Sequence, residues 1–219
     1  MNNILFIGNS FTARNNVPQL LVDLAAERGH EVRFDLIQAG GASLRMHWNK
    51  GDAAKAIAKG KYDWVVLQEQ STLPVKNAER TRENVELFVE PVASSGAKLA
   101  LYLTWARRNA PESQQLITNA YTSIGKQVGA TVVPAGVAWE TFLAKHKAPV
   151  LHDKDLSHPT LAGSYLAACV FLATLFKENA TGIETELNGI TAAERLVLQK
   201  TAWAVGQSNG KTPDASRGT

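Results

Sequence analysis

Three residues of this chain have the side-chain types that nucleophilic catalysis requires. Ser10 lies near the start of the sequence, and Asp155 and His158 lie near its end. A serine hydroxyl attacks a carbonyl carbon only when a base removes its proton, and histidine is the commonest such base. His158 could take the Ser10 proton, while Asp155, three residues earlier, could accept the other ring N–H and fix the tautomer. These residue types predict acyl transfer through a serine ester.

Taken alone, each of these parts is weak evidence, so the interpretation depends on where they lie. A serine after a Gly-Asn turn is often only a capping residue, and an Asp-x-x-His pair often only holds a loop together. Ser10, however, directly follows an apolar run over 4–7, and open α/β sheets bind ligands at the carboxyl ends of their strands. Asp153 is a rival to Asp155, but it would need a looped-out path to reach His158. We therefore expect Asp155 to be the orienting carboxylate.

The tetrahedral intermediate of acyl transfer also needs hydrogen-bond donors that are already in place. The backbone N–H groups of Ser10 and Gly41 are two candidates for this oxyanion hole. A side-chain amide from Gln68 or Gln70 is a third, because both follow the apolar run 64–67. Gln70 is the favoured donor, although a shift of strand register would give the role to Gln68, and either amide could instead make structural hydrogen bonds.

Three further side chains follow strand ends and are candidates for substrate contact. His47, Trp48 and Trp105 are expected to line an acyl or sugar pocket, although aromatic residues at strand ends serve plain packing equally often. The sequence shows no cluster with metal-ligand spacing, so no metal and no cofactor are expected. Cys169, the one cysteine, lies in an apolar helical pattern and is expected in the core.

Hydrophobic periodicity predicts an alternation of strands and helices. The expected strands are 4–7, 31–37, 64–67, 98–103 and 131–133. The expected helices are 15–29, 52–59, 77–95 with a kink or break at Pro91, 112–129, 137–147, 160–178 and 191–205. This spacing is typical of right-handed βαβ units around a parallel sheet.

The fold class that follows is α/β, with three α/β/α layers around a flavodoxin-like five-stranded parallel sheet. The first strand is continuously apolar and belongs in the centre, whereas the second alternates and belongs at an edge. The expected strand order is therefore 2-1-3-4-5. We expect one domain over residues 1–206 and a loose C-terminal tail over 207–219, where Gly, Ser, Asn and Pro are frequent.

The motifs together resemble the SGNH (GDSL-like) hydrolase superfamily, over nearly the whole body from Ile4 to about Phe176. The blocks that carry the resemblance are IGNSFT at 7–12, GGASL at 40–44, VLQEQS at 66–71, DLSHP at 155–159 and HPxxxGSYL at 158–166. More narrowly, they are similar to a bacterial subgroup of poorly defined function. The resemblance implies a Ser10, Asp155, His158 triad with Gly41 as the oxyanion glycine.

Two positions depart from the pattern of that superfamily. Asn9 stands where an aspartate usually precedes the nucleophile, and we expect this to be tolerated because that side chain does not perform the chemistry. The Gly-x-Asn of the third block is replaced by Gln68-Glu69-Gln70, which leaves the identity of the amide donor open.

The expected function is a serine esterase that hydrolyses small acyl esters, acetyl esters first, with O-acetylated carbohydrate as one substrate class. One alternative is a flavodoxin-like module that binds phosphate or flavin, which leaves the Asp155 and His158 pair unexplained. Another is a catalytically silent SGNH relative that binds sugar. The acyl chain and the alcohol partner do not follow from the sequence.

Charge and hydropathy restrict the remaining function classes. The chain has 219 residues with 23 Lys and Arg against 20 Asp and Glu, and the formal charge of +3 is scattered, not gathered in a run. We therefore expect no nucleic-acid partner and no membrane partner, while the oligomeric state is undetermined. A cytoplasmic location follows if Met1 is the native start, and a secreted or periplasmic one if a signal peptide has been removed.

Overall fold

The sheet of this protein has five parallel strands in the order β2-β1-β3-β4-β5. The computed structural model describes residues 1–208. The strands are β1 (Asn2–Gly8), β2 (Val32–Gln38), β3 (Trp64–Leu67), β4 (Lys98–Tyr102) and β5 (Thr131–Val133). The predicted α/β class and strand order are both confirmed.

Burial explains the places of the first two strands. The last five residues of β1 are buried, as expected for a central strand covered on both faces. In β2 buried or half-buried residues alternate with exposed ones along most of the strand, which suits the edge that it occupies. The carboxyl ends of β1, β2 and β3 thus lie side by side, so the loops that follow these strands meet at one edge.

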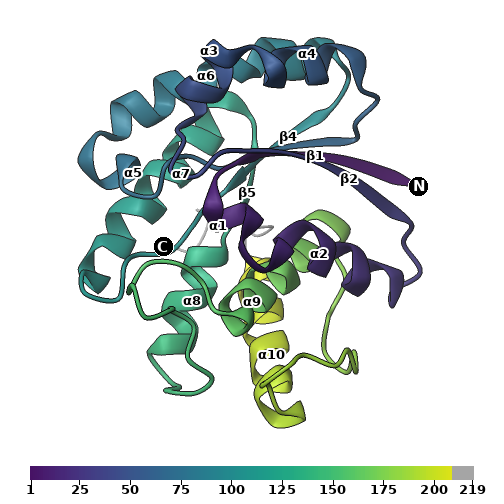
Figure 1. The fold of residues 1–219 in the computed structure, drawn as a ribbon, viewed down its shortest axis with the longest axis vertical. Helices are drawn as coiled ribbons and strands as arrows, with labels where there is room; N and C mark the ends of the chain where they lie inside the picture. Colours follow the sequence, from purple (N-terminus) through teal and green to yellow (C-terminus); the bar gives the residue numbers. More distant parts are fainter. Residues whose placement is uncertain (209–219) are drawn as a thin grey trace, which may run out of the picture.

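Helices cover both faces of the sheet (Figure 1). One face packs against α2 (Val17–Ala26), α8 (Ala135–Leu143), α9 (Leu161–Phe171) and α10 (Ala192–Ser208). The other face packs against α3 (Leu44–Lys50), α4 (Asp52–Lys59), α6 (Ala78–Ser94) and α7 (Gln114–Val128). Each side encloses its own cluster of buried apolar side chains, which gives the three α/β/α layers predicted from the sequence.

Some helices differ from the expectation in their ends or in their type. Pro91 lies inside α6, which continues past it to Ser94 as one helix. The expected helix 160–178 is α9 followed by a π-helical segment, η3 (Leu172–Phe176). Thr191 and Glu194 form the predicted capping box, with the Thr191 N–H donating to the Glu194 carboxylate at 2.8 Å.

Short helices after the strands were not expected. They are α1 (Ser10–Ala13), η1 (Arg14–Asn16), α5 (Leu73–Lys76) and η2 (Pro111–Ser113). Because these segments have about one turn each, they show no hydrophobic period, and no element was expected over the residues of α3. The turn at α1 matters most, since it begins at Ser10.

At the C-terminal end, residues 207 and 208 belong to α10 and not to the predicted tail. The rest of that tail, 209–219, lies outside the described residues. Within residues 1–208, none of the helices combines the length and the hydropathy that crossing a bilayer requires.

Candidate active site

The structure brings Ser10 into contact with His158, which lies 148 residues later in the sequence. The Ser10 Oγ lies 2.8 Å from the Nε2 of His158. The Nδ1 of the same ring lies 2.5 Å from the Oδ2 of Asp155. A hydroxyl, an imidazole and a carboxylate thus form one continuous hydrogen-bonded chain, the arrangement in which histidine can activate a serine.

Asn9 fixes the position of Ser10. Its Oδ1 caps the short helix α1 by accepting the N–H of Phe11 at 3.1 Å. Its Nδ2 donates to the Ala42 carbonyl at 3.0 Å, which ties the loop after β1 to the loop after β2. An aspartate could accept but could not donate, so the asparagine at this position makes both contacts where an aspartate would make one.

Gly8 provides room for the contact between the loops after β1 and β3. A Cβ built there would lie 2.7 Å from the Gln68 Oε1 and 2.7 Å from the Thr12 Oγ1. Both atoms belong to a buried hydrogen-bond network, since Gln68 accepts from the Asn9 N–H at 2.9 Å and from Thr12 at 3.0 Å. A side chain at position 8 would force this network apart.

The loop 152–159 aims His158 at Ser10. The Asp155 Oδ1 accepts the backbone N–H groups of Ser157 at 3.0 Å and His158 at 2.9 Å, which closes a tight turn. Leu156 adopts a left-handed backbone with φ 62° inside this turn. The Trp105 Nε1 donates to the Ser157 carbonyl at 3.0 Å and anchors the loop to the end of β4.

Asp155 is held in its ionised form. The hydrogen bond with His158 is the largest cause, and the two backbone N–H groups of the turn add to it, so the pKa of this carboxyl lies well below its usual range. The side chain is 46% exposed, so solvent screens the effect and we draw no stability from it. Asp155 is therefore an acceptor for the imidazole N–H throughout the neutral pH range.

Asp153 makes different contacts. Its Oδ2 accepts from the Arg14 guanidinium at 2.8 Å, and its Oδ1 accepts the Lys154 N–H at 2.7 Å. Arg14 also lies 3.8 Å from the Asp155 Oδ2. The geometry thus favours Asp155 over Asp153 as the partner of His158. Asp153 instead links its loop to the segment after α1 through Arg14.

The two glutamines after β3 have different surroundings. The Gln68 side chain is buried, and its Oε1 accepts from Asn9 and Thr12 while its Nε2 donates to the Glu69 carbonyl. These intramolecular hydrogen bonds favour Gln70 over Gln68 as the oxyanion donor. The half-buried Gln70 remains available.

The orientation of the Gln70 amide follows from the donors around its oxygen. Its Oε1 accepts the N–H of Thr72 at 2.9 Å, the Thr72 hydroxyl at 3.0 Å and the N–H of Leu73 at 3.0 Å. With the oxygen held in this way, the Nε2 is the free end of the amide, and it has no acceptor among residues 1–208. Gly41 lies in the wall of the same pocket as Gln70, with a left-handed φ of 67° that glycine adopts without strain.

Glu69 is a buried residue that supports the site and was not expected from the sequence to do so. Its carboxylate accepts the N–H of Leu44 at 3.1 Å, the N–H of Gln70 at 2.6 Å and the Nδ2 of Asn84 at 2.7 Å. Burial is the largest effect on this carboxyl and raises its pKa, while these three donors oppose the shift. A charged residue two positions after a buried strand was the available signal. Glu69 joins the loops after β2 and β3, which carry Gly41 and Gln70.

We expect Glu69→Ala to lower the free energy of unfolding by about 2–4 kcal/mol, because it leaves buried donors without acceptors. Urea unfolding followed by circular dichroism measures this. Glu90→Ala, which removes an exposed carboxylate from the surface of α6, is the matched control and should change stability by less than about 0.5 kcal/mol. Equal stabilities for the two variants would show that the Glu69 contacts contribute little.

The aromatic residues expected in the substrate pocket have packing contacts instead. His47 is buried and its Nε2 lies 2.7 Å from the Gly8 carbonyl, while Trp48 packs edge-on against Phe88. The ring of Trp105 stacks on those of Phe11 and Trp139, at centroid distances of 5.0 and 3.8 Å. These contacts favour packing roles for His47 and Trp48, whereas Trp105 also lies in the walls of two pockets.

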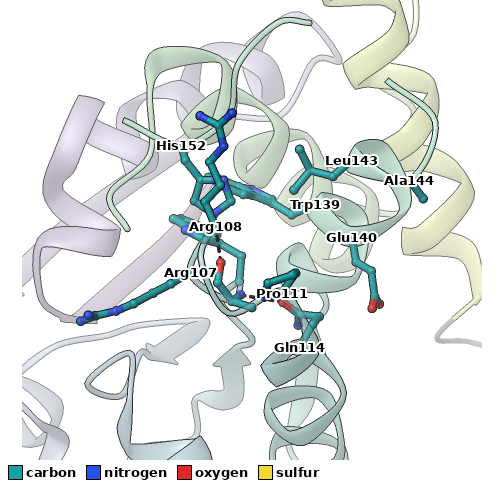
Figure 2. A pocket seen from close by; sticks show the side chains of 11 residues that line it. Arg107, Arg108, Pro111, Gln114, Trp139, Glu140, Leu143, Ala144 and His152 are labelled. Carbon is teal, nitrogen blue, oxygen red and sulfur yellow. Dashed lines mark hydrogen bonds between the residues drawn. The ribbon is translucent and has the colours of Figure 1, made fainter. Parts of the chain in front are cut away.

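Three pockets lie near this edge of the sheet. The tryptophan pocket, about 400 Å³, lies between α8 and the segment after β4; Figure 2 shows Trp139, Leu143 and His152 in its wall. The Arg107 pocket, about 370 Å³, is lined by Gln70, Ser71, Thr72, Val75, Lys76, Trp105, Ala106, Arg107, Ala110, Ser113 and Ile117. The Arg45 pocket, about 570 Å³, is lined by Gly41, Ser43, Arg45, Met46, Gln70, Leu73, Arg80 and Asn84.

Two further reactive side chains among residues 1–208, His152 and Cys169, make no hydrogen bond to Ser10, Asp155 or His158. His152 is buried, and its Nε2 lies 2.9 Å from the Ala106 carbonyl. Cys169 is buried in α9, and burial raises the pKa of its thiol, so it is a core residue as expected. Within residues 1–208, His, Cys, Asp and Glu side chains form no group that could hold a metal ion.

Comparisons with known proteins agree with the fold. No family model matches the chain, and no curated protein matches it by sequence. Among solved structures, a protein from Slackia heliotrinireducens described as a candidate SGNH hydrolase has 27% identity and a TM-score of 0.69, with 80% of this chain and 98% of that chain covered.

Two further structures share the fold at lower identity. A DUF4886 family protein from Bacteroides uniformis has a TM-score of 0.80 at 21% identity and covers 98% of both chains. The acetylxylan esterase Axe2 from Geobacillus stearothermophilus has a TM-score of 0.64 at 17% identity, with 78% of this chain and 92% of that chain covered. The fold is that of the SGNH hydrolase superfamily, which confirms the resemblance predicted from the sequence motifs.

Proposed function

We propose that this protein is a serine esterase of the SGNH type, with Ser10 as nucleophile, His158 as base and Asp155 as the orienting carboxylate. The observation that carries the proposal is the chain of two hydrogen bonds, 2.8 Å from Ser10 to His158 and 2.5 Å from His158 to Asp155. Chance rarely places these three side chains in this order at the carboxyl edge of a parallel sheet, where such folds bind ligands.

The mechanism follows from the atoms that face one another. The His158 Nε2 takes the proton of the Ser10 hydroxyl as its Oγ attacks the ester carbonyl, and Asp155 stabilises the imidazolium that forms. The imidazolium then gives the proton to the departing alcohol oxygen, which leaves an acyl group on Ser10. A water molecule, deprotonated by His158, attacks this acyl-enzyme and releases the acid.

The oxyanion of each tetrahedral intermediate needs donors on the side away from His158. We assign this role to the backbone N–H groups of Ser10 and Gly41 and to the Nε2 of Gln70. The orientation of the Gln70 amide supports the assignment, because Thr72 and Leu73 hold its oxygen and leave its nitrogen free. Such donors act most strongly when they are fixed before the reaction begins.

We expect Gln70→Glu to lower kcat by at least about 10²-fold, because the carboxylate can still accept from Thr72 and Leu73 but cannot donate to the oxyanion. Ester hydrolysis under saturating substrate measures this, and Gln115→Glu on the exposed face of α7 is the matched control. A loss of less than about threefold, a small fraction of what one oxyanion donor contributes, would exclude Gln70 from the oxyanion hole.

Small acyl esters are the proposed substrates, with acetyl esters of carbohydrates as one class. The pockets that border Gln70 have volumes of about 370 and 570 Å³, and a structure with this fold is an acetylxylan esterase. A panel of p-nitrophenyl acetate, butyrate and octanoate tests the proposal. We expect the acetate to have the highest kcat/KM, whereas preference for octanoate would overturn the small-acyl assignment.

The two alternatives make different predictions. A flavodoxin-like module that binds phosphate or flavin has no need of a histidine held between a serine and an ionised carboxylate. A silent sugar-binding relative would have the geometry but would hydrolyse none of the esters. Turnover of any ester that depends on Ser10 excludes both.

A further inference from the structure

Positive charge gathers around the proposed oxyanion hole. The Arg45 pocket and the Arg107 pocket meet at Gln70, which lies in the wall of each. Four cationic side chains, which we call the rim cations, line these two pockets: Arg45, Lys76, Arg80 and Arg107. Neither wall contains an aspartate or a glutamate. A net charge of +3 for the whole chain gives no hint of this concentration.

Most of the rim cations have no carboxylate partner in the protein. Arg80 pairs with Glu83 at 2.8 Å. Among residues 1–208, by contrast, no carboxylate oxygen lies within 4.0 Å of the charged nitrogens of Arg45, Lys76 or Arg107. The Arg107 side chain points away from the tryptophan pocket in Figure 2, and it belongs to the wall of the pocket beside Gln70 as well.

Arg45 has the most firmly oriented side chain of the four. The side chain is half-buried, and its Nε donates to the Asn84 Oδ1 at 3.1 Å, which orients the guanidinium. Its two terminal nitrogens make no hydrogen bond to residues 1–208. The nearby Glu69 carboxylate accepts from Leu44, Gln70 and Asn84. The Arg45 charge acts on it through space and opposes the rise that burial causes in its pKa, but no hydrogen bond joins the two side chains. A guanidinium with a free terminal fork is suited to a carboxylate or a phosphate.

We propose that the substrate of this site is a negatively charged ester, one that carries a carboxylate or phosphate group close to the scissile bond. The rim cations bind that group, and Arg45 is the main contact, since it shares a pocket wall with both Gly41 and Gln70. The inference rests on the proposed esterase function and narrows it. A substrate anion in either pocket would lie close to these cations in a partly enclosed pocket. The attraction between opposite charges is stronger there than in bulk water.

Matched pairs of esters test this charge preference directly. The pair 4-acetoxybenzoate and 4-acetoxybenzamide differs by a charge in the alcohol part, and p-nitrophenyl hemisuccinate and p-nitrophenyl butyrate differ by a charge in the acyl part. We expect the charged member of at least one pair to have about tenfold higher kcat/KM, mostly through a lower KM. The advantage should shrink in ~0.5 M NaCl, where the screening length is only a few ångströms.

Variants connect the preference to the named residues. Arg45→Gln and Arg107→Gln should each reduce the charged-to-neutral ratio of kcat/KM, and Arg45→Lys should retain part of it. Arg33→Gln is the control, since Arg33 is on β2 at the opposite end of the sheet and 69% exposed. For Arg33→Gln, the charged-to-neutral ratio of kcat/KM should equal that of the unmodified protein.

The results distinguish a failure of the proposed charge preference from a failure of the proposed esterase function. Turnover of neutral esters without preference for either charged ester would overturn the inference and leave the esterase function standing. A charge preference that survives in both Arg45→Gln and Arg107→Gln would also overturn it. Failure to hydrolyse any of these esters would instead contradict the proposed function.

Discussion

Replacing Ser10 by alanine is expected to lower ester turnover by at least ~10⁴-fold, which corresponds to roughly 5 kcal/mol or more in the activation barrier. The hydroxyl is the atom that forms the covalent bond to the acyl group, so no neighbouring side chain can replace it. The Ser10 Oγ has its hydrogen bond with His158 and is not part of the apolar core. The variant should therefore fold, which a thermal melt would check.

Ser94→Ala is the control for this experiment. Ser94 is exposed in α6, where its hydroxyl donates to Glu90 at 2.8 Å, and the variant should hydrolyse esters at the rate of the unmodified protein. If Ser10→Ala retained more than about one per cent of turnover, a loss far below that typical of a triad nucleophile, another group would be the nucleophile.

Asp155→Asn and Asp153→Asn are expected to differ by orders of magnitude. The asparagine at 155 keeps the shape of the turn but favours the wrong imidazole tautomer, so turnover should fall by about 10³-fold or more. Asp153 contacts Arg14 and the Lys154 N–H, not the His158 ring. Asp153→Asn should therefore cost no more than about tenfold, or ~1.4 kcal/mol.

The two aspartate variants are measured on the best ester of the panel, with circular dichroism to confirm folding. A crippled Asp153→Asn with an active Asp155→Asn would reverse the assignment. Full activity in both would mean that His158 needs no carboxylate partner, and the triad would reduce to a dyad of Ser10 and His158.

The sheet could be predicted from the sequence because its signals are local. Four apolar residues in a row define β3, and Trp64–Leu67 has the expected bounds. The strand order followed from comparing the burial patterns expected for the first two strands, which the structure bears out. The pairing of Ser10 with His158 was predicted from the residue types and their motif spacing, because the loop that carries His158 follows α8 and not a strand of the sheet.

Side-chain partners across loops could not be predicted. Whether Gln68 or Gln70 faces the crevice depends on the Asn9 and Thr12 contacts, which exist only once β1 and β3 lie side by side. The same holds for Trp105, whose ring stacks on those of Phe11 and Trp139 from two other segments.

Charge patterns showed the same limit. The rim cations come from segments after β2, β3 and β4, and along the sequence they are separated by acidic residues such as Glu69 and Glu83. Only the fold shows that Glu69 is enclosed by donors while Arg45 faces a pocket. Cations and anions that are mixed along the sequence are therefore separated in the fold, and positive charge is concentrated at the site.

Labelling with a fluorophosphonate probe, followed by peptide mapping, shows whether Ser10 is the nucleophile, because the probe reacts with activated serine hydroxyls irrespective of the natural substrate. We expect one modified residue, Ser10, and loss of labelling in both Ser10→Ala and His158→Ala. Labelling at Ser71 or Ser157, or no labelling of the folded protein, would contradict it.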